Sequence, residues 1–247
     1  YRSLSGGAYT VPSDYDIWFK TYYSANSTAK TFTSSDPSTI LSNLMGSYIS
    51  SGGAVGIGSG FSATGTTATY TFNLNTILEV IQKVQELGPS TWYWYVDPAT
   101  NTLYYKNTGS TADHTMVKGK HINELDVEAS KEDIINVVYF TGGEKTAGVN
   151  VYVNRTSPSS LVNNRRGVAR LSDPKVKGAT GEATGTIIAD NYIAGHSAQK
   201  YITKIKISAR TYDISTFDLG ELVGFGGFGT FVDNLLLQIV GITRNVD

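Results

Sequence analysis

The chain lacks cysteine altogether, which excludes a disulfide framework and a thiolate metal site. Charge is also scarce, because charged residues make up 17% of the chain and leave a net charge of −1. A chain this neutral shows no electrostatic footprint for nucleic acid, so we expect no direct sequence-specific binding of it. No run of about 18 apolar residues occurs either, and the sequence therefore predicts no transmembrane segment.

The residues that are abundant indicate a strand-rich globular protein. Hydrophobic residues form 40% of the 247, enough for a core in one large domain or two small ones. The 16 tyrosines and 26 glycines are typical of β structure with many turns. The chain begins at Tyr1 with no methionine or signal pattern, so we interpret it as a piece of a longer polypeptide.

Residues 75–106 predict a helix followed by a β-hairpin. Thr76 and Glu79 have the spacing of a capping box, and Gly88 followed by Pro89 ends the helix. Aromatic-rich strands are expected over 92–96 and 102–106, joined by the turn at 97–101. The apolar residues recur at helical spacing and so form one side of the helix, which we expect to be buried. They are Ile77, Val80, Ile81, Val84 and Leu87.

The aromatic run Trp92, Tyr93, Trp94 and Tyr95 allows two interpretations. Large aromatic side chains usually belong to the core, and we favour that interpretation on composition. The alternative is a platform on which sugar rings stack, as in a carbohydrate-binding or host-adhesion module. Its partner would be a host cell-surface glycan.

The remaining pattern predicts an α+β fold that is mostly β, with a soft boundary near residues 127–130. Asp36 and Pro37 begin a helix, and residues 181–195 form another. Gly142 and Gly143 are expected to turn the strand at 134–141 back on itself. Further strands are predicted over residues 9–11, 15–20, 67–74, 114–117, 148–154, 201–210, 222–225 and 231–242.

Residues 224–229 match the spacing G-x-G-x-x-G. Dinucleotide binding needs a helix directly after this motif to hold the pyrophosphate, and the residues that follow are β-like. We therefore predict no cofactor. The better interpretation is a hairpin loop that exposes Phe225 and Phe228 to a partner subunit.

No catalytic or metal-binding constellation is evident, and we predict no enzyme. His114, His121 and His196 lack metal-ligand spacing, and no His–acid pair or nucleophile is apparent. A glycan hydrolase that uses Asp213 and Glu221 is the third hypothesis, because glycosidases need two carboxylates. The adjacent pair Arg165 and Arg166 could bind an anion, but such pairs are usually solvated or bridged to an acid. The third hypothesis predicts that Asp213→Asn and Glu221→Gln abolish glycan cleavage.

Several segments, in this order, resemble tail-tip (baseplate hub) proteins of long-tailed bacteriophages and prophages. One departure stands out: Leu219, Gly220 and Glu221 occupy a turn where the family pattern is Pro-Gly-Asp. The resemblance covers roughly residues 31–247 and consists of motif order rather than an active-site signature. The matching segments are 35–41, 70–72, 76–88, 92–97, 103–106, 118–122, 132–143, 204–208, 212–214, 219–223 and 237–240.

The resemblance implies a structural protein of the virion, assembled in the host cytoplasm, which closes the tail tube as a homotrimeric ring. Its partners would be itself, the distal tail protein and the tape-measure protein. It also implies β-barrel-like hub domains: residues 1–30 link to or complete a barrel, 31–128 form an α/β helix–hairpin domain, and 129–247 form a β-barrel-like domain with one helix. Ring closure needs two different patches, and residues 163–170 and 224–231 are our candidates. The expected contact residues are Phe225, Phe228, Phe231, Arg165 and Arg166.

Overall fold

The computed structural model describes residues 29–58, 61–73, 75–131, 134–207 and 212–243. Within these ranges the protein is mixed α and β, with more strand than helix. The helices are α1 (Pro37–Ser50), α2 (Ile77–Leu87), α3 (Pro158–Asn163), α4 (Gly181–His196) and α5 (Thr230–Asp233), with a 3₁₀ turn η1 (Ile214–Thr216). The strands are β1 (Lys30–Ser35), β2 (Gly56–Ile57), β3 (Ala68–Phe72), β4 (Trp92–Asp97), β5 (Thr102–Asn107), β6 (His114–Val117), β7 (Glu128–Ser130), β8 (Val137–Thr146), β9 (Val149–Thr156), β10 (Val168–Asp173), β11 (Lys200–Ile202), β12 (Leu222–Gly226) and β13 (Leu236–Gln238).

The strands form small sheets that stay open. Their orders are β1-β3, β10-β8-β9, β11-β7, β13-β12-β6 and β2-β5-β4. A barrel needs a sheet with enough strands to curl and close on itself, and none of the described sheets does so. The strand-rich α+β expectation is therefore supported, and the β-barrel expectation is not.

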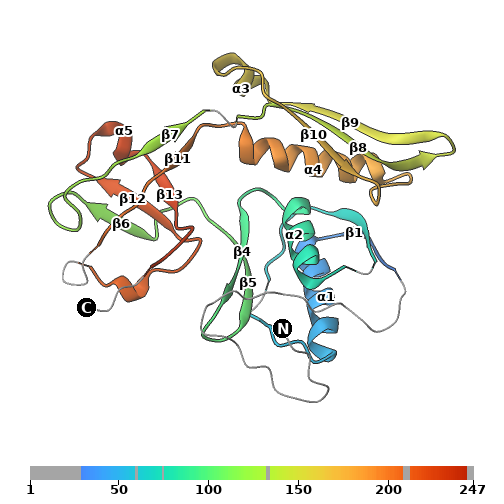
Figure 1. The fold of residues 1–247 in the computed structure, drawn as a ribbon, viewed down its shortest axis with the longest axis horizontal. Helices are drawn as coiled ribbons and strands as arrows, with labels where there is room; N and C mark the ends of the chain where they lie inside the picture. The colour runs from blue at the N-terminus through green and yellow to red at the C-terminus, as the bar shows by residue number, and fades with distance from the viewer. Residues whose placement is uncertain (1–28, 59–60, 74, 132–133, 208–211, 244–247) are drawn as a thin grey trace, which may run out of the picture.

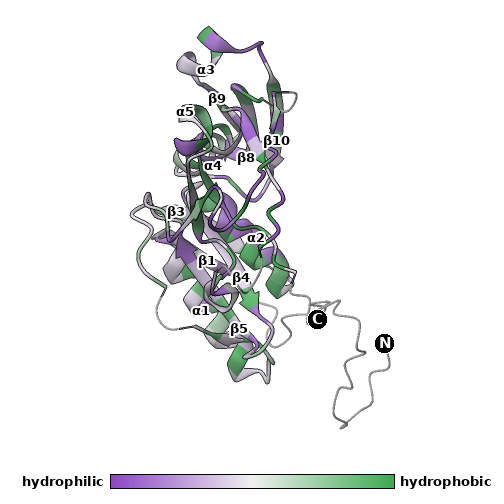
Figure 2. Cartoon of the chain, turned by 90° about the vertical axis from the view of Figure 1, so that its left-hand side faces the viewer, coloured by the Kyte–Doolittle hydropathy of each residue, from purple (hydrophilic) through white to green (hydrophobic). Residues whose placement is uncertain are grey.

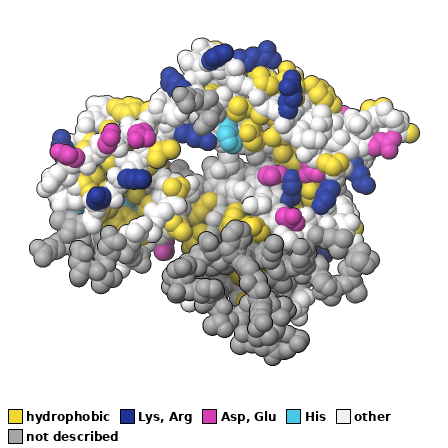
Figure 3. Space-filling model, viewed as in Figure 1, with side chains coloured by type: hydrophobic (Ala, Val, Ile, Leu, Met, Phe, Trp, Pro, Cys, Tyr) yellow, Lys and Arg dark blue, Asp and Glu magenta, His cyan; other side chains and the backbone are white. Residues whose placement is uncertain are grey.

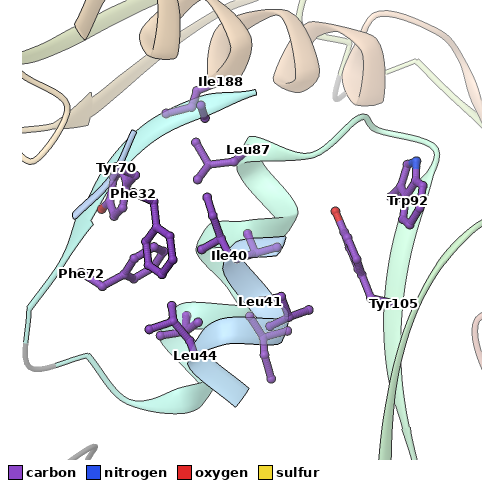
Figure 4. Close-up of a cluster of buried hydrophobic side chains, with 14 of the residues drawn as sticks. Phe32, Ile40, Leu41, Leu44, Tyr70, Phe72, Leu87, Trp92, Tyr105 and Ile188 are labelled. Atoms are coloured by element: carbon purple, nitrogen blue, oxygen red, sulfur yellow. The ribbon is translucent and has the colours of Figure 1, made fainter. Parts of the chain in front are cut away.

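The main core lies where α1 and α2 pack together (Figures 1 and 4). Asp36 caps α1 by accepting a hydrogen bond from the Ser38 N–H at 2.9 Å, and Pro37 takes the first helical position. The capping box of α2 is confirmed, because Thr76 and Glu79 each accept the other's backbone N–H. Figure 2 shows hydrophilic and hydrophobic residues mixed along both helices, and the buried residues recur on one side of each.

Helix α4 lies between the sheet β10-β8-β9 and helix α2 (Figure 1). Two glycines on the side that faces the sheet let it approach closely. A Cβ at Gly181 would lie 2.5 Å from a Val151 methyl group, and one at Gly185 would lie 2.8 Å from the Phe140 ring. These glycines lower the intrinsic helix propensity but allow the packing, which explains why a glycine-containing helix forms here.

The Gly185→Ala substitution is expected to lower the free energy of unfolding by about 1–2 kcal/mol. Alanine improves helix propensity by up to about 1 kcal/mol, but its methyl group overpacks the buried ring of Phe140. Gly195 lies in the same helix with nothing within 4 Å of an added Cβ, so Gly195→Ala should raise stability by about 0.5 kcal/mol. Urea unfolding of both variants tests the pair, and equal effects would contradict the packing explanation.

A second, smaller core lies around the sheet β13-β12-β6, at the left of Figure 1. Its buried members are Met116, Ile122, Phe217, Val223 and Phe225. Side chains from residues 32–105 and 138–193 share the first core instead. The division into domains at residue 128 stays a prediction. The two cores divide the chain differently, because each contains side chains from both sides of residue 128. Residues 1–28, which include the strands expected at 9–11 and 15–20, lie outside the described residues.

Three local predictions are corrected by the structure. Gly142 and Gly143 lie inside β8, where an added Cβ would be 2.3 Å from the carbonyl oxygens of Val176 and Pro174, respectively. The chain turns instead at Ala147 and Gly148, between β8 and β9. The strand predicted at 201–210 pairs only as far as Ile202 within the described residues. Part of the strand predicted at 231–242 is helix α5. In the first case the glycines allow another backbone segment to approach closely. In a sequence, glycines of this kind look the same as glycines that mark a turn.

Candidate functional site

The sheet β10-β8-β9 has one covered face and one open face. Val138, Phe140 and Val151 are buried on the side of α4. No described element lies over the opposite face (Figure 1), where Tyr152 is 56% exposed. The pair β8–β10 is parallel, and parallel strands are normally covered on both faces. The open face is therefore the most prominent surface for a partner.

Two tyrosines and two arginines define this surface, which we call the Tyr/Arg face: Tyr139, Tyr152, Arg166 and Arg170. The rings of Tyr139 and Tyr152 are stacked, with centroids 6.4 Å apart. Arg166 donates from Nη2 to the Tyr139 hydroxyl at 3.2 Å, and Arg170 is the register neighbour of Tyr139. Neither guanidinium forms an ion pair with any carboxylate of the described ranges. Tyrosine and arginine dominate the energetic centres of protein interfaces.

Asn136 fixes the segment that carries Arg165 and Arg166. Its side chain is fully buried, donates from Nδ2 to the Arg165 carbonyl at 3.1 Å, and accepts from the Gly167 N–H at 3.0 Å. A buried amide is stable only when it is paired, so Asn136 and this segment hold each other in place. The sequence analysis missed its role. The available signal was a single polar residue inside the apolar run of residues 134–140.

The phenylalanine candidates have different environments. The expected exposure of Phe225 is wrong, because alternation along β12 directs its ring into the second core, where it is 5% exposed. Phe228 is half-buried against Phe225, and the Lys118 ammonium lies 5.9 Å from its ring. Phe231 is 58% exposed and packs edge-on against Tyr201. Phe231 therefore offers the most accessible ring of the three.

The aromatic run splits between the two faces of the hairpin. Trp92 is buried and Trp94 packs against the first core, so the core interpretation holds for the tryptophans. Tyr93 and Tyr95 point the other way, with stacked rings 6.0 Å apart. Successive side chains of a β-strand point to opposite faces, which produces this division.

The outward tyrosines cover one another's ring faces. Tyr95 stacks on Tyr104 at 5.0 Å, and the Lys106 ammonium lies 4.7 Å from the Tyr104 centroid. At the other end Gly220 (φ 86°) lies against the Tyr93 ring. Burial, with the nearby Tyr95 hydroxyl and the Glu221 carboxylate, raises the pKa of Tyr93 to about 12. Sugar stacking needs free ring faces, so this geometry does not favour the carbohydrate platform.

A partly buried group that the sequence analysis did not find joins Tyr212, His114 and Glu221. His114 is 8% exposed, with Nε2 2.8 Å from Glu221 Oε2 and Nδ1 3.0 Å from the Tyr212 hydroxyl. The sequence analysis identified no His–acid pair, and the fold brings this one together. Positions 114 and 221 are 107 apart, so no local spacing could reveal the contact. The arrangement ties β6 to the turn before β12.

The carboxylates of the hydrolase hypothesis hold local structure. Glu221 accepts from the Asp218 N–H at 2.7 Å as well as contacting His114. Asp213 caps η1 by accepting from the Ser215 hydroxyl and N–H, and these bonds lower its pKa. Across the described residues no cluster of three His, Asp or Glu side chains could hold a metal ion. In those same residues no helix has both the length and the apolar character needed to cross a bilayer.

Comparisons with known proteins give similarity only to solved structures, since no family model and no curated protein matches. Prophage tail protein gp18 from Listeria monocytogenes is 13% identical, with a TM-score of 0.41 over 65% of this chain and 46% of that one. The prophage MuSo2 43 kDa tail protein from Shewanella oneidensis is 12% identical, with a TM-score of 0.46 over 79% and 57%. A tail protein from Neisseria meningitidis MC58 is 11% identical, with a TM-score of 0.47 over 79% and 58%. The chain thus spans about half of the length of these tail proteins, and TM-scores below 0.5 do not establish a shared fold.

Proposed function

We propose that this chain is a structural component of a phage tail tip, where identical copies form a ring-shaped hub and carry out no enzymatic reaction. The ring would close the tail tube and link the tube, the tape-measure protein and the host-recognition parts. The distal tail protein would be a neighbour. The protein would act in the virion after assembly in the bacterial cytoplasm.

The open Tyr/Arg face is the observation that carries an assembly role. A sheet with a parallel pair, a buried face under α4 and an exposed face of tyrosine and arginine, whose guanidinium groups form no ion pair within the described residues, is suited to a macromolecular partner. The order of sequence motifs over residues 31–247 is what connects this assembly surface to tail-tip proteins. Gly220, the central residue of the turn that departs from the family pattern, keeps a positive φ of 86° and packs on Tyr93.

The solution mass of the purified chain tests the proposal. One chain is 26.6 kDa, so a closed trimer should give roughly 80 kDa by light scattering across a concentration series. Negative-stain microscopy of the same sample should show rings. A strict monomer throughout the series would contradict self-assembly of this chain.

The proposal that the chain has no enzymatic activity is tested separately on bacterial cell-wall preparations. No release of soluble sugar is expected from the wild-type chain. Release that is lost in both Asp213→Asn and Glu221→Gln would replace the structural proposal with the hydrolase hypothesis.

A further inference from the structure

The near-neutral charge of the whole chain conceals a basic segment that runs through the sheet β10-β8-β9. Residues 145–172 contain four arginines and one lysine and no aspartate or glutamate, within a chain of net charge −1. The lysine and Arg155 each pair with a carboxylate of α4. Figure 3 shows basic side chains over the part of the molecule that carries α3 and this sheet. Three arginines are exposed and form no ion pair with any carboxylate of the described ranges: Arg165, Arg166 and Arg170.

The strand register places the arginines of the Tyr/Arg face beside aromatic rings and an amide. Arg170, Tyr139 and Asn154 are neighbours across β10, β8 and β9. Tyr152 lies in the next row of the same face, because side chains two residues apart in a strand point the same way. The rings of Tyr139 and Tyr152 are nearly parallel, with 22° between their planes. The face therefore presents two flat rings in similar orientations beside guanidinium groups.

The two carboxylates that flank the basic segment lie away from these arginines. Asp173 is buried on the opposite side of the sheet, where it binds Tyr70 and Lys83. Glu144 lies one row beyond Tyr152, past an irregularity in the register of β8, and accepts from the Gly148 N–H at 2.7 Å. Within the described residues, no carboxylate therefore stands between the arginines and the two rings.

We infer that the Tyr/Arg face of the free chain binds single-stranded nucleic acid without reading its sequence. Guanidinium groups bind phosphate oxygens in a planar, bidentate geometry, and tyrosine rings stack on any unpaired base. A duplex keeps its base faces inside its own stack, and an acidic peptide gives the two parallel rings no role, so a single strand fits best. The inference goes beyond the proposed hub, because it concerns this face while it is open. A second copy that covered the face would compete with the strand.

Fluorescence anisotropy of a labelled oligothymidylate of about 12 nucleotides, titrated with the full chain, tests the site. Tyr152→Leu should weaken binding by about tenfold, whereas Tyr152→Phe keeps the ring and should bind like the wild type. Arg170→Gln should reduce the slope of log Kd against log salt by about 0.7, the value for one lost phosphate contact on a single strand. Arg155→Gln is the matched control, because Arg155 belongs to the same sheet but binds Asp190 on the covered side. Equal losses in Arg170→Gln and Arg155→Gln, or unchanged binding in Tyr152→Leu, would overturn the inference.

Unlabelled competitors separate a single strand from the other anionic partners. The unlabelled oligothymidylate should displace the labelled strand better than a DNA duplex or a polyglutamate of the same length. Stronger displacement by the duplex or by polyglutamate would overturn the inference in favour of double-stranded DNA or an acidic protein segment. The mass of the chain without nucleic acid separates this inference from the hub. A trimer that binds no oligothymidylate would leave the hub standing and remove the inference, whereas a strict monomer that binds it through Tyr152 and Arg170 would do the reverse.

Discussion

Replacing Asp173 with alanine is expected to lower the free energy of unfolding by about 3 kcal/mol. Asp173 is 9% exposed and accepts a hydrogen bond from the buried Tyr70 hydroxyl at 3.0 Å. Its Oδ2 also lies 2.9 Å from the Lys83 ammonium. Removing one partner of a buried ion pair typically costs about 3–5 kcal/mol, and the lower figure applies because Lys83 keeps its pairing with Glu86.

Contact with Asp173 contributes to a raised pKa in both of its partners, Tyr70 and Lys83. Burial and then the charge of Asp173 raise the pKa of Tyr70 far above its ordinary value. Burial alone would lower the pKa of Lys83, but its hydrogen bonds to Glu86 and Asp173 outweigh burial and raise it. Without Asp173 the Tyr70 hydroxyl stays buried and loses its acceptor, which adds a desolvation penalty.

An exposed ion pair in the same protein provides the control for Asp173→Ala. Arg155 donates from Nε and Nη2 to both carboxylate oxygens of Asp190, and both side chains are nearly half exposed. Solvent-exposed pairs contribute about 0–1 kcal/mol, so Asp190→Ala should have a much smaller effect in the same urea titration. Losses of similar size from the two substitutions would show that the Tyr70–Asp173–Lys83 contacts do not stabilise the fold.

The sequence predicted the elements whose determinants are local. Helix α2, its capping box and the β4–β5 hairpin follow from residues within a few positions of one another, and all three are present. The aromatic run was harder, because composition cannot say which ring points inward. Only the register of the hairpin separates Trp92 in the core from Tyr93 outside it.

Features that depend on distant contacts could not be predicted from sequence. Asp173 meets Tyr70 across 103 positions, and His114 meets Glu221 across 107. The glycines of β8 gave the wrong signal for the same reason, since the neighbour that requires Gly142 is the carbonyl of Val176 rather than a turn. The candidate site was found in part: Arg166 and Phe231 lie on exposed faces, whereas Tyr139, Tyr152 and Asn136 were not anticipated.

Replacing Gly167 with alanine is expected to cost about 4 kcal/mol of stability and to reduce self-association of the molecules that remain folded. A Cβ at Gly167 would lie 1.8 Å from the Ile134 carbonyl oxygen, which is backbone and cannot move aside cheaply. The Gly167 N–H binds buried Asn136, and its carbonyl accepts from the Asn136 and Val137 N–H groups. Any shift that admits the methyl group therefore breaks these bonds and leaves polar groups unpaired.

The same shift would move Arg166 away from the Tyr139 hydroxyl that it contacts at 3.2 Å. The Tyr/Arg face would then lose its arrangement even in folded molecules, so self-association measured by sedimentation velocity should weaken in Gly167→Ala. Gly46→Ala is the control, because an added Cβ there has nothing within 4 Å and should leave self-association unchanged. Unchanged self-association of a destabilised Gly167→Ala chain would show that the Asn136 contacts serve the fold alone, whereas a joint loss would show that one buried amide supports both the sheet and the surface it presents.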